Sequence, residues 1–259
     1  MKERFKNLGN KTLSLILITF ILTLCLSLKY KETKTIDANI LGIGTNNQLY
    51  LWENNAWKHI PNSGDVIDIA IMKNGTVVGI GKNEQLYTRG GINWKEETVS
   101  NDAAPSSSHK ESSEKNQKVN NNTKWQNVSN SGNVSSVAIA KDGSILGIGK
   151  NKNIYKWKQS ALSSAWEQIP NSGDVTDITV MNDGTILGVG TNKELYIRKD
   201  NAWKNIPNSG SVIDVAVTKD GTILGVGTNN KMYIWVKTDL SSSWEVVDNS
   251  EGIIAIAAK

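Results

Sequence analysis

The feature that most constrains this chain is one short string that occurs five times. Ile-Leu-Gly-Ile-Gly begins at Ile40, and near copies of it begin at Val77, Ile145, Ile186 and Ile223. The first Gly of each copy follows the previous one by 37, 68, 41 and 37 residues. Self-similarity at such a period is typical of repeat proteins, in which every repeat is one supersecondary unit that packs on its neighbours.

Each copy opens the same succession of short segments. A polar turn follows the string and leads into an aromatic strand with one of five tyrosines, Tyr50, Tyr87, Tyr155, Tyr196 and Tyr233. A Trp comes next in each repeat, at Trp57, Trp125, Trp166, Trp203 and Trp244. It is followed by a turn whose Asn residues are Asn62, Asn130, Asn171, Asn208 and Asn249. After one more apolar strand come Asn-Gly or Asp-Gly pairs, which predict two-residue type I′ hairpins.

Four short strands per repeat predict an all-β fold, a five-bladed β-propeller over residues 39–259. The chain enters on the second strand of a blade at Asn39 and ends with a first strand, Gly252–Lys259, that has no successor. We therefore expect the C-terminal strand to pair beside Ile40–Gly44 and close the ring, which removes the open sheet edges. A solenoid would need capping segments, and the sequence shows none.

The N-terminal segment predicts export or membrane attachment. Residues 13–28 carry no charge and follow four basic residues, so residues 1–28 read as a signal peptide or a signal-anchor helix. Residues 29–38 read as a polar stalk. An uncleaved anchor is favoured over a cleaved signal, and a buried core helix is the third alternative. The propeller is therefore expected to be extracytoplasmic, either anchored through residues 13–28 or secreted after cleavage.

One repeat is interrupted by a polar insertion. Residues 95–124 are rich in Ser, Asn, Lys and Glu and show no hydrophobic periodicity, which predicts a disordered surface loop. Trp94 and Trp125 both have a spacing that could complete the blade. Trp125 has the matching downstream sequence, so we assign the blade to Trp125.

Composition excludes several classes of function. The only Cys is Cys25, which lies in the apolar N-terminal segment, and the only His are His59 and His109. Thiolate metal sites, zinc enzymes and most catalytic triads are therefore not expected. Residues 1–34 carry a net charge of +5 and the remainder −1, which argues against a nucleic-acid partner. We expect no catalytic residues, no metal and no cofactor.

The repeats resemble a known family. Trp-x-x-Ile-Pro-Asn-Ser-Gly, followed by Val-x-Asp-Ile, Asp-Gly-Thr-Ile-Leu-Gly-Val and Leu-Tyr, is similar to tectonin repeats and to the five-bladed tachylectin-2 type of lectin propeller. The resemblance covers residues 39–259 apart from the inserted loop. Leu187 and Leu224 stand where tectonin repeats often have Trp. The resemblance implies binding of sugars or glycolipids, without catalysis, at shallow sites repeated around the ring.

The candidate ligand residues are the Trp and the turn Asn of each repeat. The Trp rings could stack on the apolar face of a pyranose, and the alternative is that they wedge between blades. The Asn amides could bind sugar hydroxyl or amide groups, and the alternative is that they only satisfy their own turns. The ligand set is then Trp57, Asn62, Trp125, Asn130, Trp166, Asn171, Trp203, Asn208, Trp244 and Asn249.

Two further sets of residues recur in the repeats. The second residue after the Tyr is Trp52, Trp157 or Trp235 in three repeats and Arg89 or Arg198 in the other two, and this variation indicates a less buried, outer position. A mid-strand Asp recurs as well, although Asp is disfavoured in strands. It indicates either a buried structural network or a ligand or cation site near the axis, and Ser136 and Ala255 interrupt the set of Asp68, Asp177 and Asp214.

The leading functional hypothesis is a non-catalytic, multivalent lectin-like module whose partners are glycans or glycoconjugates. Several weak sites on one rigid body gain avidity on a glycan-coated surface. The alternative is a protein-interaction scaffold that uses the rim and the loop at 95–124. An enzyme in the central channel is the third hypothesis, and clustered His, paired carboxylates and a nucleophile elbow are all missing from the sequence.

Overall fold

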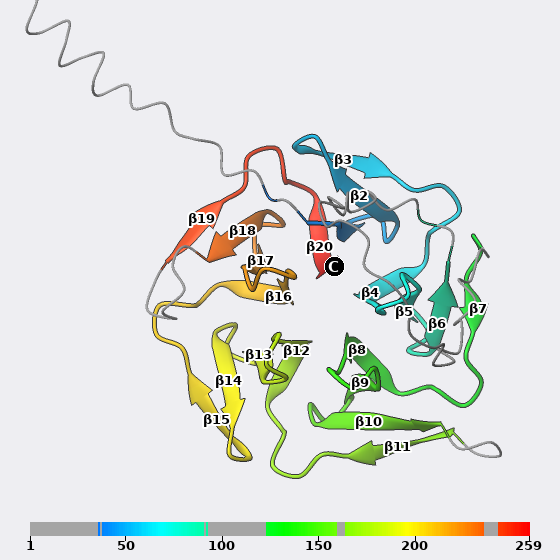
Figure 1. Cartoon of the computed structure of the whole chain (residues 1–259), viewed down its shortest axis with the longest axis vertical. Coiled ribbons are helices and arrows are strands. Elements are labelled where there is room, and N and C mark those ends of the chain that lie inside the picture. The colour runs from blue at the N-terminus through cyan, green and yellow to red at the C-terminus, as the bar shows by residue number, and fades with distance from the viewer. Residues whose placement is uncertain (1–35, 37, 91, 93–122, 160–163, 236–242) are drawn as a thin grey trace, which may run out of the picture. The chain divides into compact units, whose positions relative to one another are not determined.

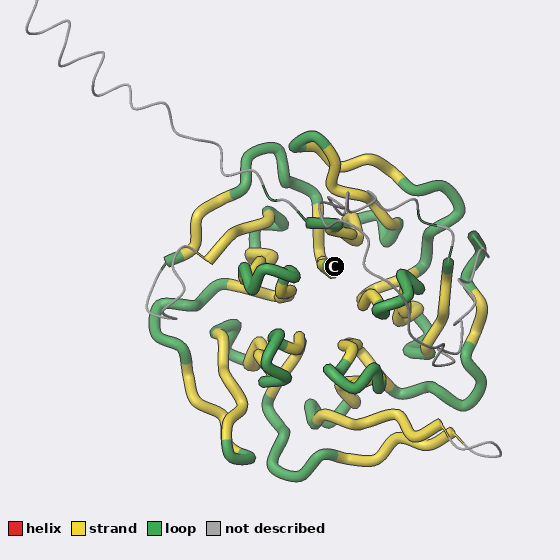
Figure 2. The backbone as a smooth tube through the Cα atoms, viewed as in Figure 1, coloured by secondary structure: helices red, strands yellow, loops and turns green. Residues whose placement is uncertain are grey.

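The propeller is made of five antiparallel sheets around one axis. The computed structural model describes residues 36, 38–90, 92, 123–159, 164–235 and 243–259, and its strands all fall in the compact unit Ala38–Lys259. Each sheet has four strands, and the sheets are arranged like the blades of a fan (Figure 1). Figure 2 shows the described backbone as strands and loops only. The predicted five-bladed β-propeller is confirmed.

Every blade has its innermost strand at the axis and its outermost strand at the rim. Blade 1 contains, in that order, β20 (Ile253–Ala258), β1 (Ile40–Gly44), β2 (Leu49–Glu53) and β3 (Ala56–His59). Blade 2 contains β4 (Val66–Ile71), β5 (Val77–Gly81), β6 (Leu86–Arg89) and β7 (Gln126–Asn127). Blade 3 contains β8 (Val134–Ile139), β9 (Ile145–Gly149), β10 (Ile154–Gln159) and β11 (Ser164–Gln168). Blade 4 contains β12 (Val175–Val180), β13 (Ile186–Gly190), β14 (Leu195–Lys199) and β15 (Ala202–Asn205). Blade 5 contains β16 (Val212–Val217), β17 (Ile223–Gly227), β18 (Met232–Trp235) and β19 (Trp244–Val246).

The ring closes within blade 1. Strand β20 pairs antiparallel with β1, with Leu41 opposite Ala257, and the Lys259 N–H donates to the Asn39 carbonyl at 2.9 Å. The C-terminal strand therefore supplies the innermost strand of the first blade, as predicted. The assignment of Trp125 to blade 2 is also confirmed, because β7 begins at the next residue and pairs with β6.

The Asn-Gly and Asp-Gly hairpins differ from the prediction. A type I′ turn needs positive φ at both central residues. Only the Gly has it here, as at Gly75 with φ of 83°. The Gly75 N–H donates to the Met72 carbonyl and the Met72 N–H donates to the Thr76 carbonyl, so the loop has three residues, Lys73 to Gly75. The prediction of two-residue type I′ turns is wrong, because a Gly in the left-handed region after a tight turn connects the twisted strands equally well.

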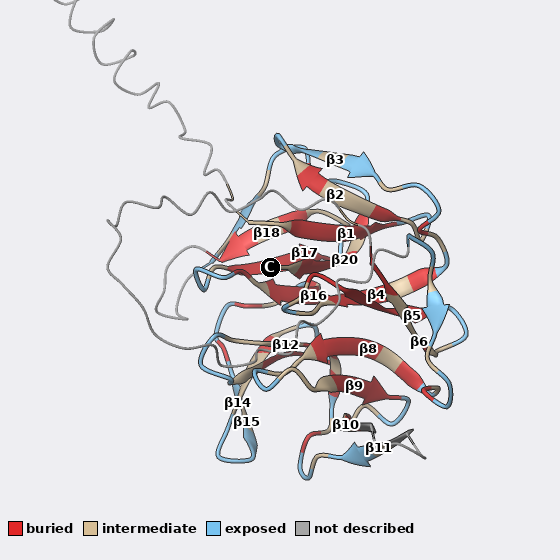
Figure 3. Ribbon diagram, turned by 45° about the vertical axis from the view of Figure 1, so that its right-hand side comes forward, coloured by how far each residue is buried: buried red, intermediate tan, exposed pale blue. Residues whose placement is uncertain are grey.

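The core lies between blades. One buried cluster joins Leu41, Ile43 and Leu49 of blade 1 to Val66 and Ile69 of blade 2, and equivalent clusters join the next blades. Burial decreases outward: the inner strands are buried and the outermost ones are exposed (Figure 3). Apolar burial between neighbouring blades is therefore the main stabilising contribution to the ring.

The predicted signal or anchor at 1–28 lies outside the described residues. So does nearly all of the predicted stalk at 29–38 and of the predicted loop at 95–124. These three assignments stay predictions. In the part of the chain that the structure describes, no helix is long and apolar enough to cross a membrane.

Candidate binding site

Two aromatic rings pack against the backbone at the Gly-x-Gly pair of each repeat. A Cβ on Gly42 would lie 2.8 Å from Cη2 of Trp57, and a Cβ on Gly44 would lie 2.6 Å from Cε2 of Tyr50. The other four blades repeat this arrangement. Both rings pack directly on the backbone of the second strand, which explains why each repeat has Gly at these two positions.

The Tyr of each blade is held by an Asn from the polar turn that precedes it. The Asn46 amide donates to the Tyr50 hydroxyl at 2.9 Å, and the same bond spans 2.8 to 2.9 Å in every blade. The Oδ1 of Asn46 accepts the N–H of Gln48 at 3.2 Å. The turn therefore fixes the amide, and the amide fixes the phenol. The donors are Asn46, Asn83, Asn151, Asn192 and Asn229.

A hollow opens between the two aromatic rings on the face of the blade. In blades 1, 2 and 3 its volume is about 280, 410 and 390 Å³, respectively. This is near the lower end of the range for small-molecule sites. The aromatic and amide lining of these three hollows, in blade order, is Trp57, Tyr50 and Asn46, then Trp125, Tyr87 and Asn83, then Trp166, Tyr155 and Asn151.

The five candidate Trp residues are partly packed between blades and partly exposed to solvent. All five are half-buried, and those of blades 1 to 3 line the hollows. Trp125 also packs against the apolar cluster between blades 1 and 2, and Trp203 packs against the cluster between blades 3 and 4. The indole N–H of Trp125 donates to the Ser63 carbonyl at 3.2 Å. These rings therefore wedge between blades and also leave a surface in the hollow.

The five candidate turn Asn residues lie elsewhere. They are exposed, their φ angles lie between 51° and 61°, and none lines the hollows of blades 1 to 3. Asn tolerates this left-handed conformation better than most residues. The buried Ser that follows holds the turn: Ser63 Oγ donates to the Ile60 carbonyl at 2.5 Å and accepts the Leu49 N–H at 2.9 Å. The structure thus brings the Trp together with Tyr and a different Asn, whose signal in the sequence is its fixed place four residues before each Tyr.

The second aromatic set does not lie at an exposed outer position. Trp52, Trp157 and Trp235 are 4 to 7% exposed, and Arg89 is 2% exposed. The prediction of a less buried position is wrong at these four residues, because an Arg can fill a buried space when its N–H groups find carbonyls; Arg198 is half-buried. Arg89 Nη1 donates to the carbonyl of Asn62 at 2.6 Å. Where a Trp is present, it packs edge-on against the candidate Trp with ring centroids 4.8 Å apart.

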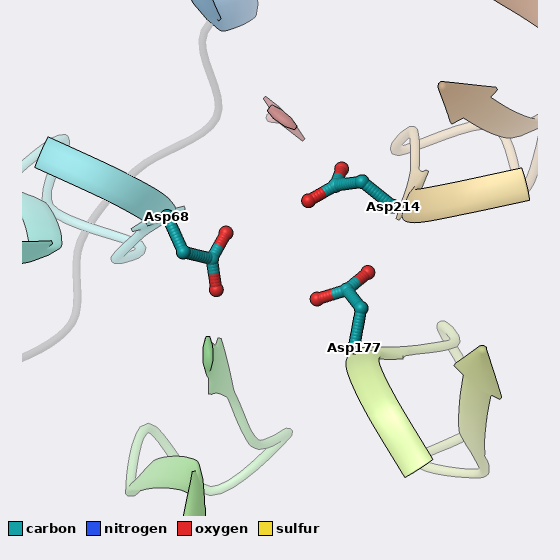
Figure 4. Close-up of side chains that lie close together, drawn as sticks. All are labelled: Asp68, Asp177 and Asp214. Atoms are coloured by element: carbon teal, nitrogen blue, oxygen red, sulfur yellow. The ribbon is translucent and has the colours of Figure 1, made fainter. Parts of the chain in front are cut away.

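Three carboxylates meet on the axis of the ring. Asp68, Asp177 and Asp214 are 4 to 5% exposed, and one carboxylate oxygen from each lies within 4.8 Å of the others (Figure 4). Burial raises the pKa of Asp177 to about 7. Burial, and then the charge of Asp177, raise the pKa of Asp68 and Asp214 well above the usual range. On geometry alone these oxygens could hold a cation, and each carboxylate already accepts hydrogen bonds from the chain.

The comparisons with known proteins agree with this architecture. The sequence profile of the Tectonin domain matches residues 108–201 and 174–251, which together make up more than half of the chain. No protein with a curated description matches the sequence. A solved structure from work on the de novo evolutionary emergence of a symmetrical protein is 12% identical with a TM-score of 0.51, covering 84% of this chain and 93% of that chain. This likeness supports the fold alone.

Two other solved structures are more distant. A protein of unknown function from Bacteroides thetaiotaomicron is 12% identical with a TM-score of 0.49, and the match covers 84% of this chain and 63% of that chain. A virginiamycin B lyase from Staphylococcus aureus, solved with quinupristin, is 13% identical with a TM-score of 0.41, covering 84% and 72%, respectively.

Proposed function

Because the chain belongs to the tectonin-domain family, we propose that its propeller is a lectin-like module that binds neutral faces of carbohydrate rings without a chemical step. The family and the fold fit a lectin-like or a protein-interaction propeller. The observation that favours the lectin is the repeated hollow between a Trp and a Tyr, with a fixed amide at its edge.

The chemistry of the hollow suits a sugar ring. The apolar C–H face of a pyranose packs on an aromatic ring, and the exposed part of Trp166 supplies such a surface in blade 3. The Asn151 amide and the Tyr155 hydroxyl offer donor and acceptor groups for the sugar hydroxyls. Since the arrangement recurs around the ring, weak single sites would combine into avidity on a surface that presents many glycans. The location we propose is extracytoplasmic, by anchoring through residues 13–28 or by secretion.

The test compares two Asn variants on a glycan array and by titration with the sugars found. Asn151→Ala removes the amide that holds Tyr155 and should lower the number of titrated sites by one. Asn171→Gly is the matched control, because Gly adopts the positive φ of 51° and Asn171 lies outside the described hollows. It should leave both binding and folding unchanged.

The outcome that would contradict the lectin is equally specific. If no glycan binds, and one protein is captured at a fixed stoichiometry that depends on residues 96–122, the propeller is a scaffold. If Asn171→Gly abolishes glycan binding while Asn151→Ala does not, the ligand site is at the turns and not in the hollows.

A further inference from the structure

The axial carboxylates bond across blade junctions. Asp68 of β4 in blade 2 accepts the Val137 N–H of β8 in blade 3 through Oδ2, at 2.6 Å. Asp177 of β12 in blade 4 accepts the Val215 N–H of β16 in blade 5 through Oδ2, at 2.8 Å. These N–H groups belong to buried inner strands, so each carboxylate satisfies a donor on the neighbouring sheet and links two blades at their narrowest point.

The series continues around the axis with one gap. Asp214 of blade 5 accepts the Ile256 N–H of blade 1 at 2.9 Å. At the junction of blades 3 and 4, the hydroxyl of Ser136 donates to Oδ1 of Asp177 at 2.8 Å. Blade 1 has Ala255 at this position, which offers no side-chain oxygen to blade 2. Four of the five junctions are therefore joined at the axis by a bond to a carboxylate, and in three of them the donor is a backbone N–H of the next blade.

The trio faces few other charged groups. Strands β8 and β20 contribute Ser136 and Ala255, and the second strands β1, β5, β9, β13 and β17 contain only apolar residues and Gly. The axial cavity next to the trio has a volume of about 340 Å³, and its only charged lining residues besides Asp68 and Asp177 are Lys73 and Lys141. Both are part of the hairpins that follow β4 and β8, and the Lys73 ammonium donates to the Lys141 carbonyl at 3.2 Å. No cation pairs with the three carboxylates among the described residues.

We propose that this trio, the axial clasp of Asp68, Asp177 and Asp214, makes the inner ring of the propeller pH-sensitive. While the carboxyl groups retain protons, the cluster is close to neutral and holds blades 2 to 3, 4 to 5 and 5 to 1 together. Ionisation of the second and third members places like charges within 4.8 Å of each other in a buried site. Opening of a junction admits water to the carboxylates and relieves this repulsion.

The direction of the pH dependence of opening follows from proton linkage. Burial and neighbouring charge raise the pKa values in the closed ring, and that of Asp177 reaches about 7. The closed ring therefore binds more protons than an opened junction, so opening becomes more favourable as the pH rises. Opening is therefore expected to begin near pH 7, where Asp177 loses its proton.

Amide hydrogen exchange on the full chain tests the clasp from about pH 5 to about pH 9. After correction for the intrinsic exchange rate, the protection of the Val137, Val215 and Ile256 amides should fall by about tenfold or more. The reason is that, for one linked proton, each pH unit changes the equilibrium constant for opening about tenfold. Two buried amides serve as internal controls, because their acceptors are serine hydroxyls that do not titrate in this range. They are the amides of Leu49 and Leu86.

Two further measurements keep the proposal refutable. Asp214→Asn keeps an acceptor for Ile256 and removes one charge, so the fall in protection should shrink at all three junctions. Should this variant fail to fold, carboxyl carbon-13 titration of the wild-type chain provides an independent test. Titration of all three Asp near the ordinary value of about 4 overturns the clasp, as does an equal fall in protection at the control amides.

Discussion

The substitution Gly149→Ala perturbs the candidate hollow of blade 3 through a single methyl group. The new Cβ would lie 2.7 Å from Cε2 of Tyr155 and 3.1 Å from Oδ1 of Asn151. Tyr155 cannot simply swing aside, because its hydroxyl accepts the Asn151 amide at 2.8 Å and the same Asn closes the turn through its own oxygen. The ring, the amide and the turn therefore have to move together.

The expected cost follows from two opposing terms. Overpacking of a well-packed site costs about 1–3 kcal/mol. Replacing Gly by Ala at a compatible φ returns about 0.4–1 kcal/mol by restricting the unfolded chain. We expect Gly149→Ala to lower the free energy of unfolding by about 1–2 kcal/mol, which is a fall in Tm of roughly 2–8 °C for a domain of this size. The displaced Tyr155 should also abolish ligand binding at this one site.

The assay is urea unfolding together with titration of the bound sugar. Gly132→Ala is the matched control, because Gly132 lines the same hollow and its new Cβ would lie 3.7 Å from the nearest side-chain atom, Cγ of Gln85. The control should keep both stability and the number of sites. In the double variant with Tyr155→Ala, the two costs should sum to more than the measured total, because the clash is gone.

Two results would refute the reasoning. If Gly149→Ala is as stable as the wild type, the ring of Tyr155 does not rest on the backbone of the second strand. If the double variant is additive, the cost arises in the strand and not from the contact between the Cβ and the ring.

Three more predictions concern the turns, the axis and the closure of the ring. Ser172→Ala leaves the buried Ile154 N–H without its acceptor at 2.8 Å, which should cost about 1–3 kcal/mol in urea unfolding; the exposed Asn171→Gly should cost far less. Burial raises the pKa of Asp177 from 3.8 to about 7, so stability present at acid pH should be lost by up to about 4 kcal/mol between about pH 4 and pH 7, and Asp177→Asn should flatten the profile; an increase in wild-type stability over this range would contradict the assignment. Removal of residues 253–259 takes away the innermost strand of blade 1 and should lower Tm and promote association through the exposed edge of β1, as measured by calorimetry and light scattering; an unchanged Tm would contradict closure by β20.

The sequence alone was sufficient for the blade count, the strand order and the closure. These properties depend on short local motifs that mark strands and turns, such as the Gly-x-Gly string and the Asn-Gly and Asp-Gly pairs. They also depend on the two incomplete parts of one blade, which lie at Asn39 and Lys259. Local rules were not sufficient for the turn geometry, because a two-residue and a three-residue hairpin can carry the same Asn-Gly pair.

The prediction of an exposed position for the second aromatic set failed because it depends on contacts between blades. The alternation of Trp52 and Arg89 predicts an exposed position, but both side chains are buried, and Arg89 donates to carbonyls of the preceding linker. The sequence favours the Asn62 turn as part of the ligand site because this turn follows the Trp strand, and that assignment stays a prediction. The bond between Asn46 and Tyr50 lies within one hairpin, and its signal in the sequence is the four-residue spacing that recurs in every repeat. The distances among the axial Asp residues likewise depend on how closely three different sheets approach the axis.

Blade 1 combines strands from both ends of the propeller, so the order of the blades around the ring does not depend on where the chain begins. Because the backbone at Asn39 meets that at Lys259 within 2.9 Å, a short peptide could join these positions while the chain is opened at any of the exposed Asp-Gly hairpins. Each such circular permutant would form the same propeller, with its chain termini in a different blade. A set of such permutants would report how tightly each blade is held by strand pairing alone, independently of where synthesis starts.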